Sequence, residues 1–207
     1  MTTVNGLPAH ILLVHAIVVL LPLAAVLLVL TAVLPSARRR LAGANAILSV
    51  LVVILVPITT NAGEWLERRV ARTPLLRTHT ELGDTAIWAA IPVALLALAV
   101  WWRQREAAAA GSAAVGAASG AAAAPVAGAP GATAASGSVA VASEAPSEKR
   151  TRRTFLAPAS NLVGTVLIVL SVLAAGAAVY DIVRIGDSGA QASWQGQFQE
   201  NPAPRGH

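Results

Sequence analysis

The sequence predicts an all-α membrane protein, with four transmembrane helices in a bundle and a long disordered loop between the third and the fourth. The chain is 56% hydrophobic and only 12% charged, which is about half the charge of a typical soluble domain. Its apolar residues gather in four blocks that are nearly free of charge. Each block is long enough to cross a hydrocarbon core of roughly 30 Å.

The limits of the four spans follow from these blocks and from helix start and stop signals. Pro8 suits a first helical position and Pro35 a stop, so the first span runs from about Pro8 to Leu34. Pro22 is expected to kink it. The other spans cover about Ala44–Thr60, His79–Trp102 and Leu162–Ile185. Gly186 suits a C-terminal cap of the fourth span.

The connections divide the chain into three regions. Residues 1–105 form a membrane domain of helices one to three, with a short surface helix near 62–72, where acidic and basic side chains occur at i,i+4 spacing. Residues 106–154 are rich in Ala, Gly and Pro and lack the pattern of a core, which predicts a disordered loop. Residues 155–207 hold the fourth transmembrane helix and a short tail.

The basic residues predict the orientation. Nine of the 15 Lys and Arg residues lie on one side of the bundle and six on the other, and the positive-inside rule places the nine in the cytoplasm. Both termini are then extracytoplasmic, and the expected location is a prokaryotic plasma membrane. The nine are Arg38, Arg39, Arg40, Arg103, Arg105, Lys149, Arg150, Arg152 and Arg153. The basic run from Lys149 to Arg153 is expected either to lie on anionic lipid or to serve as a plain stop-transfer flank.

Composition also excludes several classes of function. Without cysteine there are no disulfides, thiolate metal sites or covalently attached haem. The net charge of +5 comes from membrane-flanking clusters, so no nucleic-acid partner is expected. No phosphate loop, His-Glu-x-x-His motif or nucleophile elbow occurs, which favours a protein that is not an enzyme. No span carries a charge near its middle, which argues against an ion-coupled transporter.

Polar residues from three spans are predicted to converge at one mouth of the bundle. His10 and His15 lie near the start of the first span, and His79 starts the third, which runs in the same direction. The fourth span runs the other way and delivers Asp181 and Asp187 to the same mouth. His15, His79 and His10 are therefore candidate cofactor ligands. The candidate metal ligands are His15, His79, Asp187 and Asp181.

Each of these residues also has a purely structural interpretation. His10 suits an interfacial helix start, and His15, within apolar sequence, suits either a hydrogen-bonded structural residue or a ligand. Around His79, Thr78 and Glu81 have the spacing of a capping box. Asp181 and Arg184 are spaced to form an ion pair at the end of the fourth span.

Four segments resemble a prokaryotic family of predicted membrane proteins, domain of unknown function number 2231. The resemblance covers most of the chain except the Ala/Gly-rich loop, and its first and last segments are the most specific. The segments are Gly6–His15, Thr60–Glu67, His79–Gly83 and Arg184–Ala190. The resemblance implies the membrane fold and supplies no established activity.

Two positions depart from that family's pattern. A proline often follows its first histidine, where Ile11 stands here, and a histidine often occupies its terminal motif, where Asp187 stands. If the family's site is a histidine cluster, Asp187 weakens haem ligation in this chain. It would still suit a borderline metal such as zinc.

Three functions remain open on the sequence. The first is a multi-pass membrane protein whose His/Asp cluster at the bundle mouth binds a divalent metal or haem b. The second is a b-type haem redox subunit that exchanges electrons with quinone or a membrane redox partner. The third is a structural membrane protein without a ligand.

Overall fold

The protein is an all-α membrane protein with four spanning segments, as the sequence predicts. The computed structural model describes residues 3–4, 7–122 and 161–195. The spanning segments are α1, α2, α4 together with the short α3 before it, and α5, and each is long and apolar enough to cross a membrane. The helices are α1 (Ala9–Val33), α2 (Pro35–Glu67), α3 (Pro74–Gly83), α4 (Ala86–Ala122) and α5 (Asn161–Trp194). Two-residue strands, β1 (Thr3–Val4) and β2 (Leu7–Pro8), pair antiparallel before α1.

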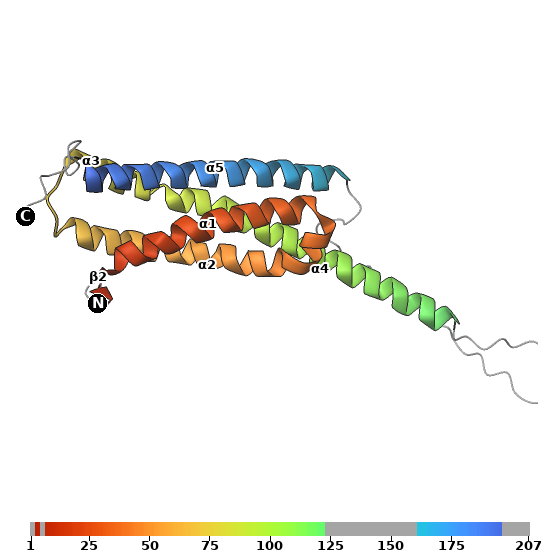
Figure 1. Ribbon diagram of the computed structural model, residues 1–207. Helices are drawn as coiled ribbons and strands as arrows, with labels where there is room; N and C mark the ends of the chain where they lie inside the picture. The colour runs from red at the N-terminus through yellow and green to blue at the C-terminus, as the bar shows by residue number, and fades with distance from the viewer. Residues whose placement is uncertain (1–2, 5–6, 123–160, 196–207) are drawn as a thin grey trace, which may run out of the picture.

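The four long helices form a bundle in which each packs on two neighbours, in the order α1, α2, α4, α5 and back to α1 (Figure 1). The short helix α3 packs mainly on α5 at one end. We call this end, with the start of α1 and the last turns of α5, the histidine end. The opposite end, which holds Leu34–Arg40 and Trp101–Arg105, is the arginine end.

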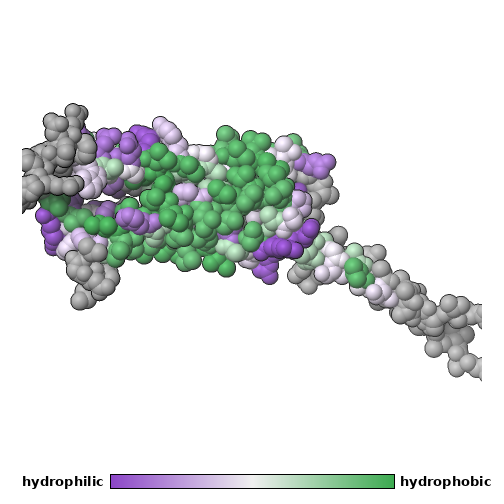
Figure 2. All heavy atoms as spheres, viewed as in Figure 1, coloured by the Kyte–Doolittle hydropathy of each residue, from purple (hydrophilic) through white to green (hydrophobic). Residues whose placement is uncertain are grey.

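Small and branched apolar side chains fill the bundle core. Ala24, Leu28, Val93 and Ala178 have no measurable exposure. Alanine at these positions lets neighbouring helices approach closely, which is the main source of packing energy within a membrane. Many large apolar side chains lie instead on the outside, where they form the green band of Figure 2 between hydrophilic ends. Helices that are apolar on both their buried and their outer faces are typical of a bundle surrounded by lipid.

One buried polar side chain joins α2 to α1. Asn45 is 1% exposed. In the amide orientation that satisfies both its polar atoms, it donates to the carbonyl of Ala24 and accepts from the amide of Leu28, each at 3.2 Å. Ala24 and Leu28 are one helical turn apart, so the amide of Asn45 spans a backbone turn of α1. Two backbone groups of a membrane helix thereby gain a partner in a neighbouring helix.

The second span is longer than predicted, and the separate surface helix near 62–72 is not formed. α2 continues without interruption to Glu67, and residues 68–73 lead into α3. Ala62 is buried and Gly63 lies against α1, so the last turns of α2 still pack within the bundle. Packing of this face extends the helix past the apolar block from which its end was predicted.

The limits of the third and fourth spans also differ from prediction. His79 belongs to α3, and α4 begins only at Ala86. α4 then runs to Ala122, so residues 106–122 are helical and not part of a loop, as the high helix propensity of alanine allows. Residues 123–154 of the expected loop lie outside the described residues. Gly186 does not end α5, because the following residues continue the helix along α3 to Trp194.

Candidate functional site

A cavity of about 800 Å³ lies at the histidine end. Side chains from α1, α2, α3 and α5, and from the segment between α2 and α3, line it. All three candidate cofactor ligands are among them, namely His10, His15 and His79. Apolar side chains form much of the remaining wall, including Ile11, Val14, Leu66, Leu76 and Ile185. The structure thus places histidines from two helices around one partly apolar space.

His10 is fixed between α1 and α2. Its Nδ1 lies 3.0 Å from the carbonyl oxygen of Thr59. A carbonyl only accepts, so Nδ1 carries the proton and donates it. The imidazole ring lies directly against Gly63, where an added Cβ would come within 2.9 Å of the ring Cε1. Glycine at 63 therefore allows the ring to reach the backbone of α2.

His79 is fixed between α3 and α5 in the same manner. Its Nδ1 lies 3.0 Å from the hydroxyl oxygen of Ser188. That hydroxyl donates its single proton to the carbonyl of Ile185 at 2.8 Å, so the imidazole must be the donor to Ser188. The ring rests on Gly189, where an added Cβ would lie 2.9 Å from Cε1. Both histidines thus have a glycine beneath the ring and an acceptor for Nδ1–H.

His15 is held differently. It is exposed, and its Nδ1 donates to the carbonyl of Ile11, one turn back on α1, at 2.6 Å. This contact folds the ring toward the start of the helix, so His15 and His10 both reach the cavity although they are five residues apart. No neighbouring helix supplies a hydrogen-bond partner to His15 among the described residues. His15 is therefore the least constrained of the three.

The three hydrogen bonds have one chemical consequence in common. With the proton on Nδ1, a neutral imidazole leaves its Nε2 lone pair free for a ligand. Histidines that bind metals usually donate the other ring nitrogen to a carbonyl or a similar oxygen, which fixes the tautomer and the ring orientation. His10 and His79 have this second contact from a neighbouring helix. Of the three candidates, they are the better prepared to act as ligands.

Asp181 and Asp187 do not line the cavity, in contrast to the prediction. α5 continues past both residues, so neither lies at a helix end. Asp181 faces the turn between α3 and α4, where its Oδ1 accepts from the Thr85 hydroxyl at 2.8 Å. Its expected partner Arg184 instead lies over the ring of Tyr180, 5.7 Å from the centroid. Asp187 is exposed and accepts from Gln191 one turn further along.

The predicted capping box at Thr78 is not formed. Thr78 lies inside α3 and donates to the carbonyl of Pro74. The N-cap of α3 is Thr73, whose side chain accepts from the amide of Leu76 at 3.1 Å. Glu81, the expected box partner, pairs with Arg77 at 2.9 Å. The sequence predicted the start of the helix one turn and a half too late, because Pro74 at the first helical position was not recognised.

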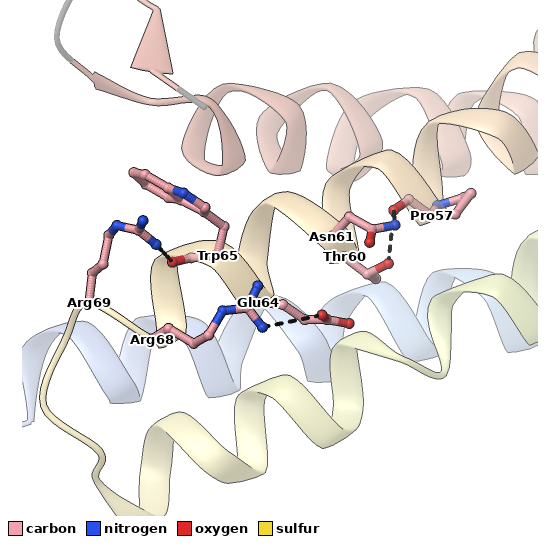
Figure 3. Close-up of polar contacts among 7 residues, drawn as sticks. All are labelled: Pro57, Thr60, Asn61, Glu64, Trp65, Arg68 and Arg69. Carbon is pink, nitrogen blue, oxygen red and sulfur yellow. Dashed lines mark hydrogen bonds and ion pairs between the residues drawn. The ribbon is translucent and has the colours of Figure 1, made fainter. Parts of the chain in front are cut away.

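The acidic side chains near the histidines are not the two that were predicted, Asp181 and Asp187. Glu64, Glu67, Glu81 and Asp84 line the cavity, and no Lys or Arg is among its described lining residues. Two arginines of this region, Arg68 and Arg69, contact side chains of α2, as Figure 3 shows. Arg68 lies 3.9 Å from Glu64, at the predicted i,i+4 spacing, and Arg69 stacks 3.7 Å from the centroid of the Trp65 ring. Glu67 and Asp84 have no ion-pair partner among the described residues, so their negative charge on the cavity wall is not balanced.

No group of three or more His, Asp or Glu residues that could hold a metal ion occurs in the described part of the chain. The predicted four-residue set of His15, His79, Asp187 and Asp181 is not brought together. The structure adds partners that sequence reasoning missed, namely Gly63, Gly189, Ser188 and the carbonyl of Thr59. The two glycines and Ser188 are visible in sequence but suggest helix breaks or caps, and a backbone carbonyl leaves no sequence signal.

Comparison of the chain with models of protein families, with curated proteins and with solved structures finds no match. The protein is a multi-pass membrane bundle with a histidine-lined, partly acidic cavity at one end.

Proposed function

We propose that this protein binds haem b in the cavity at the histidine end, where His10 and His79 would hold its iron. The observation that carries the proposal is the matched fixation of these residues. Each donates Nδ1–H to an oxygen of a neighbouring helix and rests on a glycine. Two Nε2 lone pairs on different helices are thus available in one cavity.

The donor set favours haem over an ion held by protein ligands alone. A tetrahedral zinc site needs three or four protein ligands, and the described residues offer no such group. A porphyrin supplies four nitrogens to its iron, so two histidines complete the coordination. The absence of cysteine restricts the group to a non-covalent, b-type haem.

The cavity suits a ligand of this class in size and lining. Its volume of about 800 Å³ lies within the range of roughly 300–1,000 Å³ that is common for organic ligands. Val14, Leu66 and Ile185 provide apolar wall for a flat macrocycle. Bound haem in such a bundle would supply one-electron chemistry, which supports the finer proposal of a redox subunit that serves quinone or a membrane partner.

A second candidate is a divalent cation that keeps part of its water shell. It is favoured by the four carboxylates of the cavity wall, two of which, Glu67 and Asp84, have no ion-pair partner within the described chain. A hydrated ion needs few direct protein ligands. The negative wall would also attract a cation toward the histidines.

An absorption spectrum and a metal analysis of the purified full-length protein test both candidates. Haem binding predicts a reducible Soret band that is lost in His10→Ala and in His79→Ala. His15→Ala should retain it, and His207→Ala serves as a control outside the described residues. Stoichiometric zinc, copper or another divalent ion without a Soret band would select the second candidate. A protein with neither haem nor metal after reconstitution would overturn the proposal in favour of a ligand-free bundle.

A further inference from the structure

The third spanning segment is interrupted near the histidine end of the bundle. α3 ends at Gly83 and α4 begins at Ala86, so Asp84 and Thr85 form a turn between them. Both helices pack on α5, which runs past the break without interruption. An interrupted helix leaves backbone groups at both ends without helical partners, and membrane transporters bind Na⁺ at breaks of this kind. The break is therefore a place to look for an ion site.

A hydroxyl, a carbonyl and a carboxylate meet at this break. The Thr85 hydroxyl oxygen lies 2.7 Å from the carbonyl oxygen of Leu82, in the last turn of α3, and 2.8 Å from Oδ1 of Asp181 on α5. A hydroxyl has a single proton, so the two acceptors must share it. The other carboxylate oxygen of Asp181, Oδ2, is buried and has no hydrogen-bond partner in the described structure. Acceptors thus outnumber donors around the carboxylate.

The carboxyl group of Asp181 has no ion-pair partner within the described chain. It lies inside the apolar block Leu162–Ile185 and is only partly exposed. Arg184, the basic residue of the same helix, lies over the ring of Tyr180 instead. Ionisable side chains within spanning segments are costly, usually have a partner and often mark an ion pathway. A cation would supply the partner that the protein itself does not.

We propose that Asp181 and Thr85 bind Na⁺ at the break between α3 and α4. The Thr85 proton then goes to the Leu82 carbonyl, so that a lone pair of the hydroxyl oxygen joins the two carboxylate oxygens around the cation, and water completes the coordination. A single carboxylate balances a monovalent ion, whereas affinity for divalent ions rises with the number of charged ligands. None of these three residues lines the histidine cavity, so the proposal does not depend on haem binding.

Sodium binding to the purified full-length protein tests this site. The thermal unfolding temperature is measured in detergent while NaCl replaces N-methylglucamine chloride at constant ionic strength, with KCl as a second series. Bound radioactive sodium is counted by equilibrium dialysis. An ion that binds only the folded state raises the unfolding temperature as its concentration rises. We expect saturable binding of Na⁺ and a weaker response to K⁺, because selectivity between ions follows the size of the space and these oxygens lie close together.

Two substitutions should reduce sodium binding and a matched third should not. Asp181→Asn removes the charge at nearly the same size and should abolish saturable binding. Thr85→Val should lower the affinity for sodium about 10–100-fold, the loss that is typical when a bound metal loses a supporting contact. Asp187→Asn makes the same exchange at an exposed acid further along α5 and should bind sodium as the wild type does.

The outcomes separate a cation from a proton at Asp181. Equal wild-type unfolding temperatures in NaCl and N-methylglucamine chloride would overturn the proposal, as would wild-type sodium binding by Asp181→Asn. A wild type that does not respond to sodium, together with a higher unfolding temperature of Asp181→Asn at every sodium concentration, would assign a proton to the carboxyl group and overturn the cation. Should Asp181→Asn fail to fold, Thr85→Val decides, and a sodium affinity equal to that of the wild type would contradict the proposal.

Discussion

His79 donates to the hydroxyl of Ser188 across the gap between α3 and α5, and that hydroxyl donates in turn to the carbonyl of Ile185. The chain of hydrogen bonds fixes the direction of every proton in it. While these hydrogen bonds are in place, the imidazole of His79 can present only the lone pair of Nε2 to the cavity. A single serine thus determines which ring nitrogen His79 presents to the cavity.

Replacement of this serine should weaken ligand binding without loss of the fold. In Ser188→Ala, His79 loses the acceptor that holds its tautomer and ring plane. Loss of such a supporting contact typically costs about 10–100-fold in metal affinity, and we expect a decrease of that size in haem affinity. Titration of haem into the apoprotein measures it. Ser112→Ala, on the exposed part of α4, should bind as the wild type does.

The two glycines beneath the histidines should not tolerate a methyl group. In Gly63→Ala and Gly189→Ala the new Cβ would lie 2.9 Å from an imidazole carbon. The ring must move, and overpacking of this kind costs about 1–3 kcal/mol. We expect a lower thermal unfolding temperature and loss of the Soret band in both. Gly176→Ala, with open space around the site, should be neutral or stabilising by up to about 1 kcal/mol.

Truncation to alanine should affect stability differently at Asn45 and Ser49, two buried polar residues one turn apart on α2. Asn45→Ala removes the amide that spans Ala24 and Leu28, and should lower the free energy of unfolding by about 1–2 kcal/mol. Ser49 is equally buried, but its hydroxyl has no partner in the described structure. Ser49→Ala should therefore be neutral or slightly stabilising. Unfolding in mixed detergent measures both, and equal losses would contradict the bridging role of Asn45.

The contact between Thr85 and Asp181 should stabilise the junction of α3 with α4. Thr85→Val removes the hydroxyl whose proton is shared between Asp181 Oδ1 at 2.8 Å and the carbonyl of Leu82 at 2.7 Å. The other carboxylate oxygen of Asp181 is already buried without a partner in the described structure. An acceptor left without a donor costs about 1–3 kcal/mol. Thr85→Ser, which keeps the hydroxyl, is the control. Exchange of Asp181 for Leu in the Thr85→Val background should recover much of the loss.

The orientation of the bundle is open to a direct test. The excess of basic residues in the connections after the first and third spans, nine against six, predicts that the segment after α4 is cytoplasmic and the histidine cavity extracytoplasmic. A reporter that is active only outside the membrane, fused at Gly128, should therefore be inactive. The same reporter fused after the last residue should be active. The reverse pattern would place the histidine cavity in the cytoplasm.

The sequence predicted the number of spanning helices because hydrophobic length is a local property that each block carries by itself. It failed at the helix ends, where packing on a neighbouring helix decides the outcome. Gly63 and Gly186 suggest an end to a helix, yet both lie within helices that continue at the histidine end. The histidines were identified because their type and the direction of their helices are visible in sequence. Thr59 was missed because it acts through its backbone carbonyl.

The length of α4 has a consequence for anything that contacts its far end. Beyond Arg103, which contacts Gly164 of α5, the helix extends past the other described helices to Ala122 (Figure 1), a distance of about 30 Å at the helical rise per residue. Electrostatic fields in physiological salt decay over about 8 Å. A protein that docks at Ala122 would therefore be several screening lengths from the headgroups along the helix axis. The affinity of such a protein for the end of α4 would not vary with the surface charge of the membrane, although α4 itself crosses that membrane.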